Sequence, residues 1–337
     1  MRKTYLIRHG RPDFPGGVRV CLGRSELPLG PVGRMQAFLL ACELGGRVGE
    51  VYSSPLSRAV QTAGAFSLPV TVIDGLAEQY AGEWDGLTFT EIRTRYPELY
   101  ARRAAERYLP LPGSEPDGEA LSRFTRAMDE VLSCAGTAAV VAHASVIRLY
   151  LDSLGAGMVK IPYGSYVELD GGRPVRIGVL PHPEPDDSLC LGLLRAAGTP
   201  ERVISHCAAA ADRATDLAGA LGMDVKAVRA AAYLHDIARE YSDHPDVGAG
   251  WLEELGYSEI AGMARLHHCH DGKTLDSAAV VYLADKLVLE DRPCTLAERF
   301  AASESRCVSP EAREKHNERR TAAENIVRLM EGKGVKT

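Results

Sequence analysis

Hydrophobic residues in the first half of the chain come in short runs rich in β-branched side chains, separated by longer amphipathic stretches. The runs at 4–7, 50–53, 70–73 and 138–142 predict strands, and the stretches between them have helical spacing. This alternation is typical of α/β domains. We therefore expect a three-layer α/β domain with a mostly parallel sheet over residues 1–180.

The second half has a different pattern. Alanine-rich stretches at 207–221, 225–239 and 277–289 have helical spacing and few β-branched clusters. They predict an all-α domain over residues 189–337. The charged run at 310–320 is typical of a solvated helix, and we expect it to form a C-terminal helical tail.

A proline-rich segment separates the two patterns. Residues 181–188 read Pro-His-Pro-Glu-Pro-Asp-Asp-Ser, and such a segment cannot extend a helix or a central strand. We place the linker between the two domains there. A length of 337 residues is consistent with two hydrophobic cores.

The charge balance excludes binding to nucleic acid or anionic lipid through bulk charge. The chain has 39 basic and 45 acidic residues, a formal net charge of −6. Its 45% hydrophobic and 25% charged residues are ordinary for a soluble globular protein. Anionic ligands must therefore be bound by local groups of positive charge.

We expect a cytoplasmic protein. No signal-peptide core follows the first residues, and no uncharged apolar run reaches the ~18 residues of a membrane span. The eight cysteines are scattered without a C-x-x-C pair, so we interpret them as reduced thiols.

Polar side chains follow several predicted strands of the first half. Arg8 and His9 follow the first run, Arg58 lies shortly after the second, and His143 directly follows the run at 138–142. The carboxyl ends of parallel strands line the ligand crevice of such a sheet, so these side chains could converge. Arginine forks match phosphoryl oxygens, and a neutral imidazole can attack phosphorus if a nearby acid protonates the leaving oxygen. Glu78 is a candidate for that acid.

These residues lie in motifs that resemble those of the histidine phosphatase superfamily, also called phosphoglycerate mutase-like, over about residues 3–175. The motifs, in family order, include Leu6-Ile7-Arg8-His9-Gly10, Ser53-Ser54-Pro55-Leu56, Leu76-Ala77-Glu78 and Val141-Ala142-His143. The resemblance implies that His9 is the phosphorylated nucleophile and Glu78 the proton donor. It further implies that Arg8, Arg58 and His143 clamp the phosphate, without a metal cofactor.

We expect this domain to hydrolyse its substrate rather than isomerise it, because it is short for the lid segments that protect phosphohistidine from water in a mutase. The stretch 91–119 contains Arg102, Arg103 and Arg107. It is either a substrate-facing cap or a charged surface exposed to solvent.

A second group of candidate residues lies on separate helical segments of the second half. His206, the adjacent pair His235 and Asp236, and Asp285 are set in apolar, alanine- or valine-rich surroundings. A buried carboxylate needs a partner, and a cation can supply it. Nitrogen and carboxylate ligands without a thiolate motif suit Fe, Mn, Zn, Ni or Mg.

This half resembles the HD family of metal-dependent phosphohydrolases over about residues 200–292. The resemblance implies that His206, His235, Asp236 and Asp285 are metal ligands. Further motifs resemble those of members that bind two ions, which implies that His244 and one or both of His267 and His268 hold the second ion. A hydroxide bridging the two ions would then attack a phosphoester or phosphoanhydride.

The sequence thus predicts a bifunctional phosphohydrolase that acts on a small phosphorylated metabolite or nucleotide. One alternative is a single phosphatase whose HD half binds a nucleotide as a regulatory module. Another is a phosphomutase or a phosphatase of a cofactor precursor such as a ribazole phosphate. We expect no membrane or nucleic-acid partner, and the sequence leaves the oligomeric state open.

Overall fold

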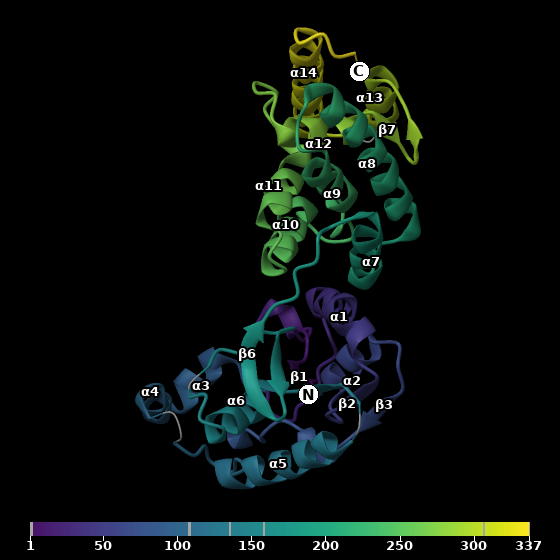
Figure 1. Cartoon of the computed structure of the whole chain (residues 1–337). Coiled ribbons are helices and arrows are strands. Elements are labelled where there is room, and N and C mark those ends of the chain that lie inside the picture. The colour runs from purple at the N-terminus through teal and green to yellow at the C-terminus, as the bar shows by residue number, and fades with distance from the viewer. Residues whose placement is uncertain (1–2, 107–108, 135, 158, 306, 337) are drawn as a thin grey trace. The chain divides into compact units, whose positions relative to one another are not determined.

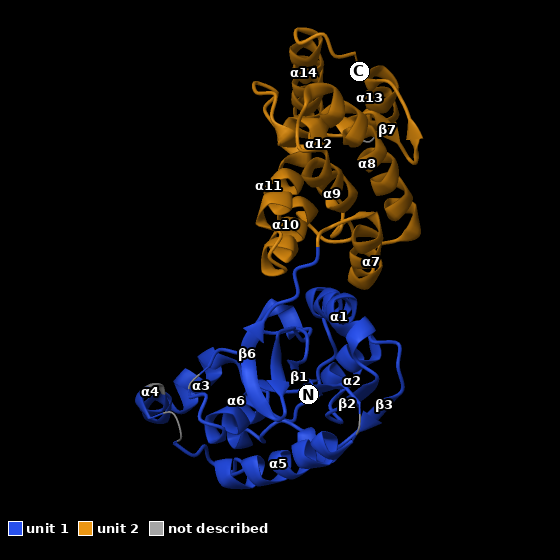
Figure 2. Cartoon of the chain, in the orientation of Figure 1, with its two compact units in different colours: residues 1–183 blue, residues 184–337 orange. Residues whose placement is uncertain are grey.

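The computed structural model describes residues 3–106, 109–134, 136–157, 159–305 and 307–336. Arg107 of the predicted cap lies outside these residues. The chain divides into two units, Met1–Pro183 and Glu184–Thr337, which are coloured separately in Figure 2. Within the described ranges, no helix has the length and apolar character needed to cross a bilayer.

Unit 1 is built on a six-stranded sheet with the order β3-β2-β4-β1-β5-β6. β1, β2, β3 and β4 are parallel, whereas β5 and β6 are antiparallel to their neighbours. The strands are β1 (Lys3–Arg8), β2 (Glu50–Ser53), β3 (Val70–Val72), β4 (Ala138–Ala142), β5 (Tyr166–Asp170) and β6 (Arg173–Val179). The predicted mostly parallel sheet is confirmed, and the hairpin β5–β6 is an addition to it.

Alternating side chains of the central strands form two cores, one on each face of the sheet. Tyr5 and Ile7 of β1 pack with α1 (Pro31–Leu44) and α2 (Ser57–Gly64). Leu6 packs on the opposite face with α5 (Asp117–Ser133) and α6 (Ala144–Ser153). This arrangement confirms the three-layer α/β fold.

The connection between β3 and α5 contains the short helices α3 (Phe89–Arg95) and α4 (Pro97–Ala105). α3 begins at a capping box, in which Thr88 and Glu91 bond each other's backbone amides. Single 3₁₀ turns complete the unit: η1 (Pro15–Gly17), η2 (Gly45–Arg47), η3 (Asp74–Leu76) and η4 (Gly82–Trp84).

Unit 2 is helical, as predicted, apart from a hairpin of two-residue strands. Its elements are α7 (Asp187–Ala197), α8 (Glu201–Leu221), α9 (Val225–Leu234), α10 (His244–Glu254), α11 (Ser258–Arg265), η5 (Leu266–His268), α12 (Ser277–Lys286), β7 (Val288–Leu289), β8 (Arg292–Pro293), α13 (Leu296–Glu304) and α14 (Pro310–Glu331). α12 is buried along most of its length and packs against α8, α9, α11 and α14 (Figure 1).

Two helix boundaries differ from the sequence expectation for local reasons. α9 ends at Leu234 rather than at 239, because His235 Nδ1 bonds the Ala232 carbonyl that the next amide of a continuing helix would use. α7 begins at Asp187, inside the segment expected as linker. Its start is set by the Asp186 side chain, which accepts a hydrogen bond from the Leu189 amide.

Candidate active sites

The parallel strands of unit 1 bring the predicted phosphate-binding residues to one edge of the sheet. β1 pairs with β4 so that Arg8 lies opposite Ala142, which makes His9 and His143 neighbours. Their ring centroids are 4.9 Å apart. Arg58 enters from the first turn of α2, and its Nε lies 3.3 Å from His9 Nε2.

The imidazole of His9 is held in one orientation. Nδ1 donates to the carbonyl of Gly10 at 2.7 Å, so the unprotonated nitrogen of the neutral ring is Nε2. The backbone is closely packed here: a Cβ at Gly10 would lie 2.3 Å from the Gly33 carbonyl oxygen. Burial, followed by the charges of Arg58 and Arg8, holds the pKa of His9 well below its usual value. His9 therefore carries a lone pair on Nε2 at neutral pH.

Two arginines, one buried and one half-buried, supply positive charge beside that nitrogen. The fully buried Arg58 donates to the carbonyls of Gly23 and Ser25 at 2.7 and 2.9 Å. Arg8 donates to the Ile161 carbonyl at 2.7 Å, and its guanidinium carbon lies 3.6 Å from the centroid of the Tyr163 ring. Burial lowers the pKa of Arg8 to about 10, so both guanidinium groups remain cations.

Glu78 lies at the amino end of α6, next to His143. Its oxygens accept hydrogen bonds from the backbone amides of Gln79 at 2.8 Å, Ser145 at 3.1 Å and Val146 at 3.3 Å. All five residues predicted for the phosphatase pocket are thus on adjoining strand ends and turns, and each of the two histidines and Arg58 is buried.

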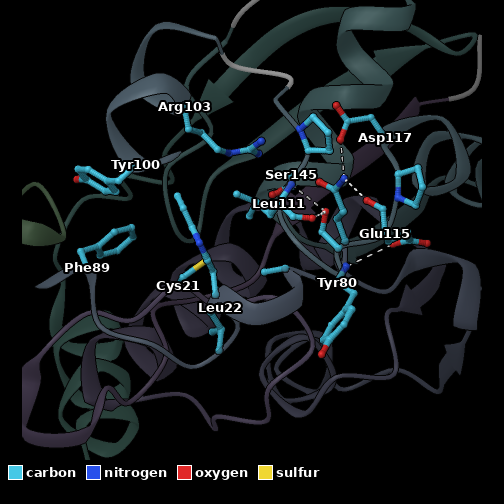
Figure 3. A pocket seen from close by; sticks show the side chains of 16 residues that line it. Cys21, Leu22, Tyr80, Phe89, Tyr100, Arg103, Leu111, Glu115, Asp117 and Ser145 are labelled. Carbon is cyan, nitrogen blue, oxygen red and sulfur yellow. Dashed lines mark hydrogen bonds between the residues drawn. The ribbon is translucent and has the colours of Figure 1, made fainter. Parts of the chain in front are cut away.

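A cavity of about 480 Å³ is lined by residues of the predicted cap and by Gln79 and Ser145, whose backbone amides bond Glu78 (Figure 3). Arg103 lines it. Arg102 instead makes an exposed pair with Glu106 at 3.2 Å. The stretch 91–119 therefore contains both cavity wall and solvent-exposed surface.

In unit 2, the seven predicted metal ligands come from five helical segments. His206 lies on α8 and Asp285 on α12, and both approach His235 and Asp236 at the end of α9. His244 begins α10, while His267 and His268 form the end of η5. Three overlapping groups keep their ligand atoms within 4.8 Å of one another: His206, His235 and Asp285; His235, Asp236 and His267; and His244, His267 and His268.

The imidazole nitrogens and carboxylate oxygens of the cluster lie close to one another. His206 Nε2 lies 3.0 Å from Asp285 Oδ1, and His235 Nε2 lies 3.8 Å from the same oxygen. Asp236 Oδ1 is 3.2 Å from His244 Nε2 and 3.4 Å from His267 Nε2. Because His235 and His267 each belong to two of the groups, the seven side chains form one connected cluster.

The hydrogen bonds of the imidazoles fit a metal centre. His206, His235 and His267 each bond a backbone carbonyl through Nδ1, at 2.7, 2.7 and 2.6 Å, which leaves Nε2 for the interior of the cluster. Among the described residues, the buried atoms His235 Nε2, His267 Nε2 and Asp236 Oδ1 have no hydrogen-bond partner. A cation would satisfy all three atoms.

The ionisation of the cluster matches this donor set. Burial lowers the pKa of His235 to about 4, so its imidazole is neutral at pH 7. Burial alone would raise the pKa of Asp236, but the histidines His235, His244 and His267 outweigh it and hold that pKa well below its usual value. Neutral imidazoles and ionised carboxylates are the forms that bind a metal.

Three contacting residues were not predicted from the sequence. Ser54 Oγ lies 2.7 Å from His143 Nε2, and Tyr163 stacks on Arg8. Lys286 Nζ donates to the His267 carbonyl at 2.9 Å and to the Asp285 carboxylate. Ser54 and Lys286 stand inside quoted motifs, which could have marked them, whereas Tyr163 lies in a loop without such a signal.

Comparisons with known proteins identify a family for each half of the chain. Residues 4–163 match the histidine phosphatase superfamily (branch 1), and residues 203–289 match the HD domain. The chain is 36% identical over 164 residues to bifunctional protein Rv2228c of Mycobacterium tuberculosis, covering 46% of this chain and 45% of that protein. The chain thus spans about half the length of the first curated relatives it matches.

Phosphoserine phosphatase 1 of Hydrogenobacter thermophilus is 31% identical over 169 residues, which cover 48% of this chain and 80% of that enzyme. Among solved structures, mycobacterial glucosyl-3-phosphoglycerate phosphatase Rv2419c matches with a TM-score of 0.46 and 26% identity, covering 54% of this chain and 99% of that one. The chain belongs to the histidine phosphatase superfamily, branch 1, and carries an HD domain after its phosphatase domain.

Proposed function

We propose that the protein is a bifunctional phosphohydrolase in which each unit has its own active site. For unit 1 we propose hydrolysis of a phosphomonoester through a phosphohistidine intermediate. The observation that carries this proposal is the lone pair of His9 Nε2, which faces the Nε–H of Arg58 while Nδ1–H is bound to the Gly10 carbonyl.

The proposed reaction has two steps. His9 Nε2 attacks phosphorus, the bond from phosphorus to the ester oxygen breaks, and Glu78 donates a proton to the departing oxygen. In the second step Glu78 removes a proton from water, the water oxygen bonds to phosphorus, and the phosphohistidine bond breaks. This releases phosphate and restores the neutral imidazole. Arg8, Arg58 and His143 hold the phosphoryl oxygens throughout.

A trapping experiment tests the nucleophile. The full chain is mixed with a ³²P-labelled aryl phosphate in the presence of chelator and quenched with alkali. We expect an acid-labile, alkali-stable protein label in the wild type and none in His9→Ala, which should also lose phosphate release. His182→Ala is the control, because His182 is an exposed histidine outside both sites. Labelling or hydrolysis that persists in His9→Ala would exclude His9 as the nucleophile.

For unit 2 we propose hydrolysis of a phosphoester or phosphoanhydride, with a nucleotide-like compound as the substrate class. The seven residues that would hold one or two divalent ions are His206, His235, Asp236, His244, His267, His268 and Asp285. Bound divalent ions supply a hydroxide near neutral pH and neutralise phosphoryl charge. The oxygen and nitrogen donors suit Fe, Mn, Zn, Ni or Mg.

One protein cation supports an anionic substrate at this site. The guanidinium of Arg239 lies 3.6 Å from Asp236 Oδ1, and its side chain is 39% exposed. It also bonds His244 Nε2 at 3.0 Å. Arg239 therefore lies where a phosphate group could reach both the cluster and a charged fork.

Metal analysis and turnover together test this site in the His9→Ala background, where only the second site would act. We expect bound transition metal and chelator-sensitive release of phosphate or nucleotide from a panel of nucleotides. Adding His235→Ala should sharply reduce both. Metal binding and nucleotide binding without turnover would instead favour the regulatory alternative, and unchanged metal content in His235→Ala would contradict the ligand assignment.

A further inference from the structure

The cavity beside Glu78 gives unit 1 a binding site for the part of the substrate that leaves. We propose that this cavity binds an uncharged aromatic leaving group, a proposal that rests on the proposed phosphatase function. The preferred substrates of unit 1 are then phosphomonoesters of a nucleoside or of a similar ring-bearing alcohol. Phosphorylated acids are disfavoured.

The position of the cavity links it to the departing oxygen. Gln79 and Ser145 both line it, and their backbone amides both bond the carboxyl group of Glu78. An ester oxygen within reach of Glu78 therefore has the cavity on one side of it. The alcohol attached to that oxygen extends into the space bounded by these two residues (Figure 3).

Part of the cavity wall is aromatic. Tyr80, Trp84, Phe89 and Tyr100 line it, and the Trp84 and Tyr100 rings lie 6.2 Å apart with an interplanar angle of 35°. Phe89 is 39% exposed, although it is a large apolar side chain. A planar ring can stack on such walls, and stacking on aromatic side chains tolerates any base because each base has a π face.

The cations near the cavity already have protein partners, which disfavours a leaving group that carries a carboxylate. Glu115 and Asp117 line the cavity together with Arg103. The arginines that could bind a substrate carboxylate nearby, Arg24 and Arg123, are paired with Glu115 at 3.1 and 2.7 Å. The Arg103 guanidinium bonds the carbonyl of Leu109.

Trp84 adds an unmet hydrogen-bond donor. The side chain is only 5% exposed, and within the described part of the chain its indole Nε1 has no hydrogen-bond partner. Buried donors are normally satisfied. Because this nitrogen is itself buried, a bound ring could reach it only after Trp84 moves, so the donor does not select between heteroaromatic and hydrocarbon rings.

The contribution of the aromatic base to kcat/KM can be measured with two substrates that have the same phosphoester group. Adenosine 5′-monophosphate and ribose 5-phosphate both release a primary alcohol, and only the first carries a base. With the full chain and chelator present, and His9→Ala subtracted as the blank, we expect kcat/KM to be about 10-fold or more higher for the nucleotide. We expect 3-phosphoglycerate, whose leaving group carries a carboxylate, to be the slowest of the three.

Variants of the wall test whether the cavity is responsible. The measured quantity is the ratio of kcat/KM for adenosine 5′-monophosphate to kcat/KM for ribose 5-phosphate. Phe89→Ala and Tyr100→Ala should each lower this ratio at least about threefold. Phe89→Tyr should keep the ratio, because it keeps the ring. Val175→Ala should also keep it, since Val175 is an exposed apolar residue of β6 that does not line the cavity. Phe89 is exposed, so its variants do not depend on repacking a core.

The possible outcomes distinguish a failure of the aromatic subsite from a failure of the proposed phosphatase function. His9-dependent hydrolysis of all three substrates with a ratio near 1 would overturn the aromatic subsite and leave the phosphatase function standing. A ratio above 10 that neither alanine variant changes would also overturn it. Hydrolysis that does not depend on His9 would contradict the phosphatase proposal itself.

Discussion

Both sites need positive charge around a phosphoryl group, but the two units obtain this charge from different groups. In unit 1 the positive charge belongs to the protein's own side chains: the buried Arg58 and the half-buried Arg8 lie beside a neutral His9. In unit 2 the chain instead gathers carboxylates, Asp236 and Asp285, around imidazole nitrogens. Such a site acquires its positive charge only by binding cations.

The difference is visible in the histidines of the two units. The pKa of His9 is lowered, by burial and then by arginine charges. Burial likewise lowers the pKa of His206, but its bonds to Asp285 outweigh burial and the net shift is upward. The cationic pocket of unit 1 therefore keeps its nucleophile unprotonated, whereas in unit 2 the carboxylate partner raises the pKa of His206 while burial keeps His235 neutral.

The largest expected effect tests whether the positive charge of unit 1 is independent of metal. Arg58→Ala should lower kcat/KM for an aryl phosphate about 10³-fold in the presence of chelator, since it removes a preorganised donor beside the reacting nitrogen. Arg58→Lys should recover only a small part, because lysine lacks the planar fork. Circular dichroism of both variants reports folding. If a divalent ion restored the activity of Arg58→Ala, the positive charge of unit 1 could also come from a metal, and the two sites would not differ in this respect.

A stability effect of about 3–5 kcal/mol is expected in unit 2 from Lys286→Met. The variant leaves the buried Asp285 carboxylate without its ammonium partner and the His267 carbonyl without a donor. Urea unfolding in the presence of chelator measures the change. Lys273→Met is the matched control: Lys273 is 80% exposed and should shift the free energy of unfolding by less than about 0.5 kcal/mol. Equal effects of the two variants would show that Lys286 is not a structural partner of the cluster.

Sequence analysis identified strands that have short apolar runs: β1, β2 and β4 inside the sheet and β3 at its edge. It missed β5, which lies inside the sheet and is mostly buried, because acidic residues interrupt the sequence Tyr-Val-Glu-Leu-Asp of this strand. β6 is an edge strand with mostly exposed or half-buried positions, and its sequence needs no apolar pattern. Its hairpin had one usable signal, Gly171 and Gly172, both of which adopt positive φ in the turn.

In both candidate sites, sequence analysis identified residues that local motifs contain, and it missed contacts between distant parts of the chain. Ligand types and their order along the chain were readable, because chemistry restricts them to a few residues. The partners that hold them were not: Lys286 reaches a carbonyl 19 residues away, and Arg8 reaches the Ile161 carbonyl across 153 residues. Such contacts depend on how strands and helices pack, which one sequence does not specify locally.

The low pKa values in unit 1 predict a loss of stability in acid. His9 and His143 are buried and neutral, and burial followed by nearby positive charge lowers both pKa values. Below about pH 6.5 the unfolded chain binds protons that the folded unit does not, so the free energy of unfolding falls as pH falls. Each histidine contributes at most about 1.4 kcal/mol per pH unit.

His143→Gln should remove one of these two contributions, because glutamine does not titrate. Hydrogen exchange of peptides from β1 and β4, followed between pH 7 and 5, reports the free energy of opening of unit 1. We expect a shallower pH dependence in His143→Gln than in the wild type. His182→Gln is the control and should leave the slope unchanged. A wild-type slope that does not change in His143→Gln would mean that His143 is protonated in the folded unit.

The smallest expected effect concerns the orientation of His143. Ser54→Ala removes the hydroxyl that lies 2.7 Å from His143 Nε2, and His143 Nδ1 has no partner among the described residues. A lost buried hydrogen bond of about 1 kcal/mol corresponds to a fall in kcat/KM of about fivefold for an aryl phosphate. Ser133→Ala, at an exposed serine of α5, should leave the rate unchanged. Because Ser54 belongs to unit 1, the chelator-sensitive activity of unit 2 should not change. A parallel loss of both activities would mean that the two units are coupled and that each site cannot be treated by its own chemistry alone.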